Sequence, residues 1–401
     1  MKAVRWLALL LAGMLTLPSL ASAQEITVGG QVRPRFEYRN PQVVTGGGGE
    51  SWISMRTRAD VTAKLDRNVT AFVQFQDVRI WGEESSTLGD FVADGFDLHQ
   101  GYVDLRSTGP TVLSGRAGRQ DVAFGGQRLV GTVNWVQQGR VFDGLMLGAD
   151  GSGFKLDLFG SAIANDYTAT HDNDEYFAAA YGQLKKAGPG ILDLYGLYNS
   201  VPTDSVKTSQ LTMGARWWGQ QGIIRFRLEG SYQAGKRDAV DVSAFMVGAR
   251  VAAVFAGGDA DLTLWYDYLS GDSDTSDDKI KVFSTLFATN HKFYGLADYF
   301  LNIPAHTGGR GLQDIALKGS WKPRGDVTLR TELHSFHAAQ SEGLSSGRFG
   351  EEIDITAGYR YSRNLNISGG FAYVFAADAW GEIGRLTENA VWTFLMLDVT
   401  F

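Results

Sequence analysis

The chain has 401 residues, of which 44% are hydrophobic and 20% charged, with 50 Gly, 8 Pro and no Cys. The absence of Cys excludes disulfides, thiolate metal sites and a cysteine nucleophile, and a formal net charge of −7 argues against nucleic acid as a partner. A high content of glycine and aromatic residues, without a helical period, predicts an all-β protein.

The first 23 residues have the features of a signal peptide. Lys2 and Arg5 provide a positive start, residues 6–17 form an apolar run, and residues 21–23 are a small-residue cleavage site. We therefore expect an exported protein whose mature domain spans residues 24–401. No later apolar run has the length that a transmembrane helix needs.

Polar and apolar side chains alternate from Glu25 onward. Residues 31–39 carry charged or amide side chains at odd positions and apolar or aromatic ones at even positions, and residues 53–65 follow the same scheme in the opposite phase. A period of two places successive side chains on opposite faces of a sheet. Segments this long, with one charged and one apolar face, are typical of strands that cross a membrane around a water-filled interior.

Turn-forming residues recur roughly every forty residues, which is the length of a membrane hairpin with its loop. The sequence therefore predicts a transmembrane antiparallel β-barrel of about 18 strands, with short periplasmic turns and long extracellular loops. A soluble sandwich or propeller is the alternative, but it would have to bury a charged face. The eight turn clusters lie at residues 66–68, 108–110, 150–153, 187–190, 219–222, 256–259, 323–326 and 362–364.

The C-terminal segment predicts the location of the barrel. Leu395, Leu397, Val399 and Phe401 alternate with other residues, and the chain ends on Phe. This is similar to the terminal strand of bacterial outer-membrane proteins, so we expect outer-membrane lipid and the barrel-assembly machinery as partners. Val61→Arg or Leu397→Arg should impair assembly, at a cost of about 2–4 kcal/mol at mid-bilayer.

Signals for catalysis and for cofactors are weak. The sequence contains no Walker A, GxSxG or HExxH motif. His334 and His337 are three positions apart on a predicted strand and therefore face opposite sides. Residues 272–278 contain four Asp that offer oxygen ligands for Ca²⁺, although a solvated loop is the favoured interpretation. We expect no enzymatic activity, no cofactor and no metal site.

Arginines recur at alternate positions on the face predicted to line the interior. An anion path is one interpretation, because rings of Arg or Lys favour anions in pores. A cross-strand ladder of ion pairs is the other, because acids share these faces at Glu37, Asp60, Glu229, Glu332 and Asp354. The arginines are Arg33, Arg35, Arg39, Arg56, Arg58, Arg116, Arg225, Arg227, Arg330 and Arg360.

Four of these arginines are predicted to form one patch. Arg33 and Arg35 share a face of the first strand, and Arg56 and Arg58 share the same face of the second. Adjacent strands lie about 4.8 Å apart, so the four charges should be close together. We expect this patch to favour anions and expect that its replacement by acids shifts selectivity toward cations.

Residues 118–144 resemble a known family. The matching elements are residues 118–120, 128–131, 135 and 140–144, and residues 99–106, 289–295 and the strands from Glu351 onward are also similar. Together they resemble the alginate-export family of Gram-negative outer-membrane barrels. The resemblance implies an 18-stranded barrel with an electropositive lumen that conducts a polyuronate.

Two segments with poor strand character are expected to shape that lumen. Residues 125–139 should form a long loop, and Arg128 and Arg140, which carry the resemblance, should include at least one residue that faces the lumen. Residues 283–304 are apolar and aromatic, which is unusual for a solvated loop. They either fold into the barrel as a constriction or form an external lid.

The sequence thus predicts a passive outer-membrane channel for anionic oligosaccharides or small anionic solutes. A general diffusion porin with a charge-balanced lumen is the first alternative. A barrel enzyme or a surface-binding barrel that transports nothing is the second.

Overall fold

The computed structural model describes residues 25–41, 48–83, 95–164, 174–202, 207–274 and 276–401, so the predicted signal peptide lies outside it. The described chain is almost entirely β-structure. Its nineteen strands are β1 (Glu25–Asn40), β2 (Glu50–Lys64), β3 (Val69–Ile80), β4 (Phe96–Arg106), β5 (Val112–Gln120), β6 (Phe142–Asp150), β7 (Phe154–Ala164), β8 (Glu175–Ala187), β9 (Gly190–Pro202), β10 (Lys207–Gln221), β11 (Ile224–Arg237), β12 (Val240–Phe255), β13 (Ala260–Leu269), β14 (Lys279–Ile280), β15 (Leu312–Arg324), β16 (Val327–His337), β17 (Arg348–Arg360), β18 (Leu365–Ala376) and β19 (Ala390–Thr400).

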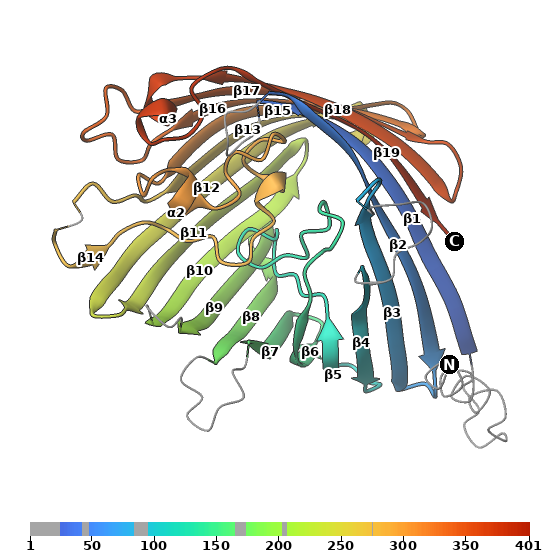
Figure 1. The fold of residues 1–401 in the computed structure, drawn as a ribbon. Helices are drawn as coiled ribbons and strands as arrows, with labels where there is room; N and C mark the ends of the chain where they lie inside the picture. Colours follow the sequence, from blue (N-terminus) through green and yellow to red (C-terminus); the bar gives the residue numbers. More distant parts are fainter. Residues whose placement is uncertain (1–24, 42–47, 84–94, 165–173, 203–206, 275) are drawn as a thin grey trace, which may run out of the picture.

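The strands form one closed antiparallel barrel, in which the last strand lies beside the first (Figure 1). β19 pairs with β1, with Val32 opposite Val399 and Phe36 opposite Leu395. The two-residue β14 pairs in parallel with β12 and is not part of the closed wall, because β13 pairs directly with β15. Without β14 the nineteen strands leave 18 in the wall, which confirms the predicted fold and leaves no sheet edge unpaired.

Short turns and long connections lie at opposite ends of the barrel. The end that holds both termini, here called the turn end, has its eight turns at residues 65–68, 107–111, 151–153, 188–189, 222–223, 256–259, 325–326 and 361–364. Each predicted turn cluster overlaps one of them. The other end, the loop end, has longer connections apart from the two residues between β11 and β12. The longest are residues 121–141 and residues 270–311.

The two faces of the wall have the predicted character. On β13, Leu264 points outward with 66% of its surface exposed, whereas its neighbour Trp265 points inward and is 6% exposed. The outward face is apolar along the other strands as well, with exposed Val61, Val247 and Leu397. Lipid is the solvent that suits such a face, and the polar side chains are left to line the interior.

Helical structure is confined to short pieces in the connections. They are η1 (Ala256–Gly258), η2 (Asn290–Lys292), α2 (Ile303–His306) and α3 (Asp378–Glu382). Among the described residues, none of these helices has the length and apolar character to cross a membrane.

Candidate permeation pathway

Two connections from the loop end narrow the interior of the barrel. Figure 1 shows residues 121–141 (teal) and the segment around α2 (orange) inside the curve of the wall. Residues 125–139 contain no strand, only an isolated bridge at Val130, as predicted. Residues 283–304 fold inward as well, since Phe293 and Phe300 are buried and the Phe300 ring lies 4.6 Å from that of Phe336 on β16. Of the two predicted arrangements, the structure has the constriction.

The two inward segments are joined to each other. The Phe287 N–H donates to the Leu129 carbonyl at 2.9 Å, and the Gly131 N–H donates to the Phe287 carbonyl at 2.9 Å. The Trp135 and His291 rings stack with their centroids 4.3 Å apart. These contacts make residues 121–141 and 283–304 one packed body, here called the constriction.

Wall arginines hold the constriction on the side of β1 and β2. Arg33 and Arg56 lie directly opposite each other and are buried, an arrangement in which like charges repel. Arg33 donates to the carbonyls of Asn134 at 2.9 Å and Trp135 at 3.2 Å. Arg56 donates to the Gln137 carbonyl at 3.3 Å. The carbonyl oxygens of the constriction thus accept hydrogen bonds from both buried guanidinium groups.

The other two members of the predicted patch have similar partners. Arg35 donates to the Trp135 carbonyl, and its guanidinium carbon lies 4.1 Å from the centre of the Trp135 ring. Arg58 is half-buried and donates to Gln76 at 2.8 Å and to the Gln138 carbonyl at 3.4 Å. All four arginines therefore lie on one inner surface, as expected from the alternation, and all four donate to residues of the constriction.

Arg39 and Arg140 also contact the constriction. Arg39 on β1 donates to the Ala297 carbonyl at 2.8 Å and lies 5.9 Å from the Tyr299 ring centre. Arg140 belongs to the first inward segment and donates to the Phe287 carbonyl of the second. Burial lowers the pKa of Arg140, because its surroundings contain no carboxylate that offsets the loss of water.

Arg128 anchors the constriction on the opposite wall. Its side chain is 1% exposed, forms an ion pair with Asp267 on β13 and lies 3.4 Å from a Glu229 oxygen on β11. It also donates to the Tyr294 hydroxyl at 3.1 Å. Burial alone would lower the pKa of Arg128, but the carboxylates of Asp267 and Glu229 outweigh it and hold the pKa above its ordinary value. Arg128 therefore stays charged inside the barrel.

A second pair of opposed arginines lies beside this anchor. Arg227 on β11 is directly opposite Arg250 on β12, and their guanidinium carbons lie 5.0 Å and 4.4 Å from the Trp265 ring centre. Arg227 is 2% exposed, and none of its three side-chain nitrogens has a hydrogen-bond acceptor among the described residues. Its nearest carboxylate is Glu229, at 3.6 Å.

This pair faces a hollow at the turn end of the barrel with a volume of about 540 Å³. The hollow lies along β10 to β16, and Asp261 and Glu332 are the only acids that line it among the described residues. We call it the basic hollow, because its lining contains the cations Arg216, Arg225, Arg227, Arg250, Lys318, Lys322 and Arg330.

A second hollow, along β4 to β7, has a different charge balance. It measures about 410 Å³, and its three cations face four aspartates. The Arg116 guanidinium lies 3.1 Å from Asp104, and Lys155 lies 2.8 Å from Asp157. Of the two hollows, only the one along β10 to β16 therefore has an excess of positive charge among its described lining residues. The pKa of Lys292, on the constriction, is lowered first by partial burial and then by the positive charges of Arg250 and Arg227.

The predicted arginines lie in four places. Arg33, Arg35, Arg39, Arg56, Arg58, Arg128 and Arg140 contact the constriction, and Arg225, Arg227 and Arg330 line the basic hollow. Arg116 lines the hollow along β4 to β7, and Arg360 donates to the Gly325 carbonyl at the rim of the turn end.

Sequence reasoning missed several residues of the basic hollow. Arg250 shares its strand face with Ala252 and Val254, so the sequence pattern predicts an apolar face there and gave no reason to select Arg250. Trp265 reads as one more aromatic residue of a membrane strand. The signal that was available is strand parity, because Arg216 and Lys318 also lie on inward positions of their strands.

The acidic segment at residues 272–278 shows no convergence on an ion. The Asp272 carboxylate accepts the Lys281 N–H at 3.1 Å, and Asp274 accepts the Ser276 N–H at 3.0 Å. Among the residues that the structure describes, this segment contributes no group of three carboxylate or imidazole ligands within reach of one ion. The contacts favour the solvated loop.

Comparison with known proteins agrees with this architecture. OpdO of Pseudomonas aeruginosa is 13% identical, with a TM-score of 0.63 over 94% of this chain and 98% of that one. OccD3 (OpdP) and the outer membrane protein OpdK of the same organism are each 12% identical, with TM-scores of 0.62 and 0.60, over 94% of this chain and 92% and 99% of theirs. No curated protein matches the sequence.

These likenesses show the fold of a porin barrel. The family is settled by a model described as alginate export, which matches residues 24–394. The match includes both inward segments and every residue of the basic hollow. The protein therefore belongs to the alginate export family of outer-membrane channels.

Proposed function

We propose that this channel conducts anionic solutes, and carboxylated oligosaccharides in particular, by passive diffusion through the basic hollow. Arg227 carries the proposal. Its guanidinium group is buried beside the hollow, opposite the like-charged Arg250, and lacks hydrogen-bond acceptors among the described residues. A carboxylate is the ligand that best supplies them, because its two oxygens match the guanidinium fork.

The surroundings of Arg227 suit transient binding. Arg225, Lys322 and Arg330 line the same hollow closer to the turns, so an anion would meet positive charge along the wall. Trp265 is 6% exposed and packs against both guanidinium groups, which holds them at the wall of the hollow. Asp261 and Glu332 limit the net charge of the hollow. A solute is therefore attracted without being held tightly.

The test is single-channel recording in planar lipid bilayers under a salt gradient. We expect the native channel to be anion-selective and its current to be blocked by oligogalacturonate more strongly than by maltooligosaccharide of the same length. The double variant Arg227→Gln/Arg250→Gln should lose both properties. A matched control, Arg324→Gln/Arg348→Gln, removes two exposed charges outside the hollow and should retain both.

The charge-balanced hollow along β4 to β7 favours a second candidate, a general diffusion porin. A channel of that kind would show little preference between anions and cations, and oligogalacturonate and maltooligosaccharide would block it equally. Equal block in the native protein, or unchanged selectivity in the Arg227→Gln/Arg250→Gln variant, would replace the anion channel with this candidate.

We also propose that export and assembly use the two ends of the chain. Removal of residues 1–23 would leave Gln24 as the mature N-terminus, which mass spectrometry of the outer-membrane protein can check. The Phe401 backbone exchanges hydrogen bonds with Gly30 at 2.9 and 3.1 Å, and its side chain points outward. Deletion of Phe401 should reduce the amount of folded barrel, if the assembly machinery reads this terminal strand.

A further inference from the structure

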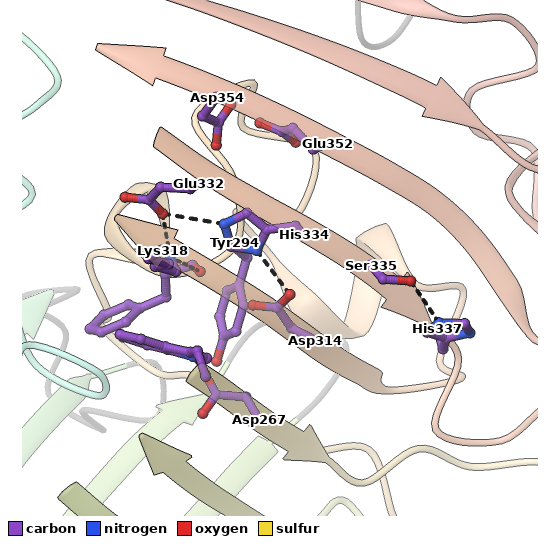
Figure 2. A network of polar contacts seen from close by, with 12 residues as sticks. Asp267, Tyr294, Asp314, Lys318, Glu332, His334, Ser335, His337, Glu352 and Asp354 are labelled. Carbon is purple, nitrogen blue, oxygen red and sulfur yellow. Dashed lines mark hydrogen bonds and ion pairs between the residues drawn. The ribbon is translucent and has the colours of Figure 1, made fainter. Parts of the chain in front are cut away.

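A second cluster of ionisable side chains lies on β15, β16 and β17, at the edge of the basic hollow (Figure 2). Glu332 and His334 are on β16, and Asp354 on β17 lies directly opposite Glu332. Asp314 on β15 completes the group. His334, Asp314 and Asp354 are at most 2% exposed, whereas Glu332 reaches the lining of the hollow.

The His334 ring is oriented by a carboxylate. Its Nδ1 lies 2.8 Å from an Asp314 oxygen, and its Nε2 points to a Glu332 oxygen at 3.3 Å. When Nδ1 donates to Asp314, the neutral ring presents the lone pair of Nε2 to the Glu332 carboxylate. Two acceptors facing each other repel unless a cation lies between them. A histidine held by a carboxylate in this way is typical of metal ligands.

Asp354 supplies a third ligand atom. One of its oxygens accepts the Leu296 N–H at 3.2 Å, and the other is buried without a hydrogen-bond partner among the described residues. Figure 2 shows this carboxylate above the Glu332–His334 contact. The ligand atoms of the three residues all lie within 4.8 Å of one another.

The charge of the cluster also calls for a cation. Asp314, Glu332 and Asp354 are three carboxylates, and the neighbouring Glu352 is a buried fourth, whereas among the described residues Lys318 is the one lysine or arginine that forms an ion pair within the group. Buried carboxylates are costly unless they are paired or coordinate a metal. Lys318 pairs with the same Glu332 oxygen that faces His334, so one ammonium group offsets one of the four carboxylates.

We propose that Glu332, His334 and Asp354 bind a divalent transition-metal ion of the zinc class. One imidazole nitrogen and two carboxylate oxygens are ligands that Zn²⁺ accepts, at bond lengths of about 2.0–2.2 Å. A tetrahedron with such bonds has edges of about 3.3–3.6 Å, and the distance between His334 Nε2 and the Glu332 oxygen is 3.3 Å. Asp354 approaches through a side-chain movement, and a water from the basic hollow takes the fourth position.

The ion would brace the constriction. Asp354 accepts the Leu296 N–H, and the Lys318 ammonium lies 3.4 Å from the Phe293 carbonyl oxygen. The cluster therefore contacts the constriction at residues 293–296. A metal that fixes Asp354 also fixes its contact with the constriction. The site is independent of which solute the channel conducts.

The experiment uses the mature, tag-free chain folded in detergent micelles and stripped of metal with a chelator. Zinc titration by isothermal calorimetry should show one site, and metal analysis after dialysis should show one zinc per chain. His334→Gln and Asp354→Asn should each weaken binding at least tenfold, and Asp314→Asn should weaken it about tenfold through the ring orientation. His337→Gln is the matched control, since His337 bonds Ser335 outside the cluster.

Heat-modifiable migration in gel electrophoresis checks that each variant is folded, and the nearly isosteric Asp354→Asn decides the question if His334→Gln does not fold. X-ray absorption at the zinc edge should show one nitrogen ligand from imidazole with oxygen ligands. Absence of stoichiometric binding, or unchanged affinity in Asp354→Asn, would overturn the proposal and leave a proton between His334 and Glu332 as the neutralising group.

Discussion

Two pairs of opposed arginines face the interior of this barrel, and their surroundings differ. Arg33 and Arg56 donate to carbonyl oxygens of the constriction. Arg227 and Arg250 have the same cross-strand geometry but face Trp265 and an open hollow. The side-chain donors of the first pair find acceptors within the protein, whereas those of Arg227 have no acceptors among the described residues.

The comparison separates two roles that look identical in the strand pattern. A buried guanidinium whose donors are used braces the wall, because removing it leaves acceptors unpaired. One whose donors are unused attracts an external anion. We therefore place selectivity in the basic hollow and regard the arginines of β1 and β2 chiefly as braces of the constriction.

The largest expected effect tests the anchor beside the second pair. Arg128→Met leaves the fully buried Asp267 without its ion-pair partner, which should destabilise the barrel by about 3–5 kcal/mol. Urea unfolding in lipid vesicles, followed by tryptophan fluorescence, measures the change. Arg140→Met is the control, since its acceptors are carbonyls and the expected cost is about 1–3 kcal/mol. Equal costs for both variants would contradict the assigned ion pair.

The next effect tests the outer face of the strand that bears Trp265. Leu264→Arg puts a charge into lipid near the middle of β13 and should cost about 2–4 kcal/mol. Leu397→Arg on β19 and Val61→Arg on β2 also replace outward apolar side chains and should impair assembly by a similar amount. An unchanged folding yield of Leu264→Arg in lipid vesicles would argue that Leu264 does not face lipid.

A direct contrast between the pairs should give a smaller difference in stability. Arg56→Met leaves buried acceptors on Gln31 and Gln137 and should cost about 1–3 kcal/mol. Arg227→Met removes no hydrogen bond. It relieves repulsion by Arg250, and Glu229 keeps Arg128 as an ion-pair partner at 3.4 Å when the 3.6 Å contact with Arg227 is lost, so the free energy of unfolding should change by less than about 1 kcal/mol. The same urea experiment compares them. A larger loss for Arg227→Met would mean that this arginine is structural.

The last prediction concerns ion selectivity, with no change in stability expected to report on it. Arg227→Glu/Arg250→Glu should reverse ion selectivity, whereas Arg35→Glu/Arg58→Glu should shift the reversal potential less, because those donors are already used. High salt should reduce both shifts, since charges are screened over about 8–10 Å at physiological ionic strength. A larger shift from the Arg35 and Arg58 variant would return selectivity to the first two strands.

Alternation and turn chemistry were sufficient to predict the barrel, its 18 wall strands and the side of the wall on which the arginines of the strands lie. The reason is physical: lipid on one side and polar side chains on the other impose a period of two, and short reversals require Gly, Asn, Asp or Pro. These signals are local, so they can be read from neighbouring residues.

Only the tertiary structure decided which arginines find hydrogen-bond acceptors within the protein. The acceptors of Arg33 lie 101 residues away, on a segment whose inward path leaves no periodic pattern in the sequence. Arg250 meets Arg227, and Glu332 meets Asp354, through strand register, which places residues side by side regardless of their spacing along the chain. Alternation specifies the direction in which a side chain points, but its partners depend on the register of the strands and on the fold of the two long connections.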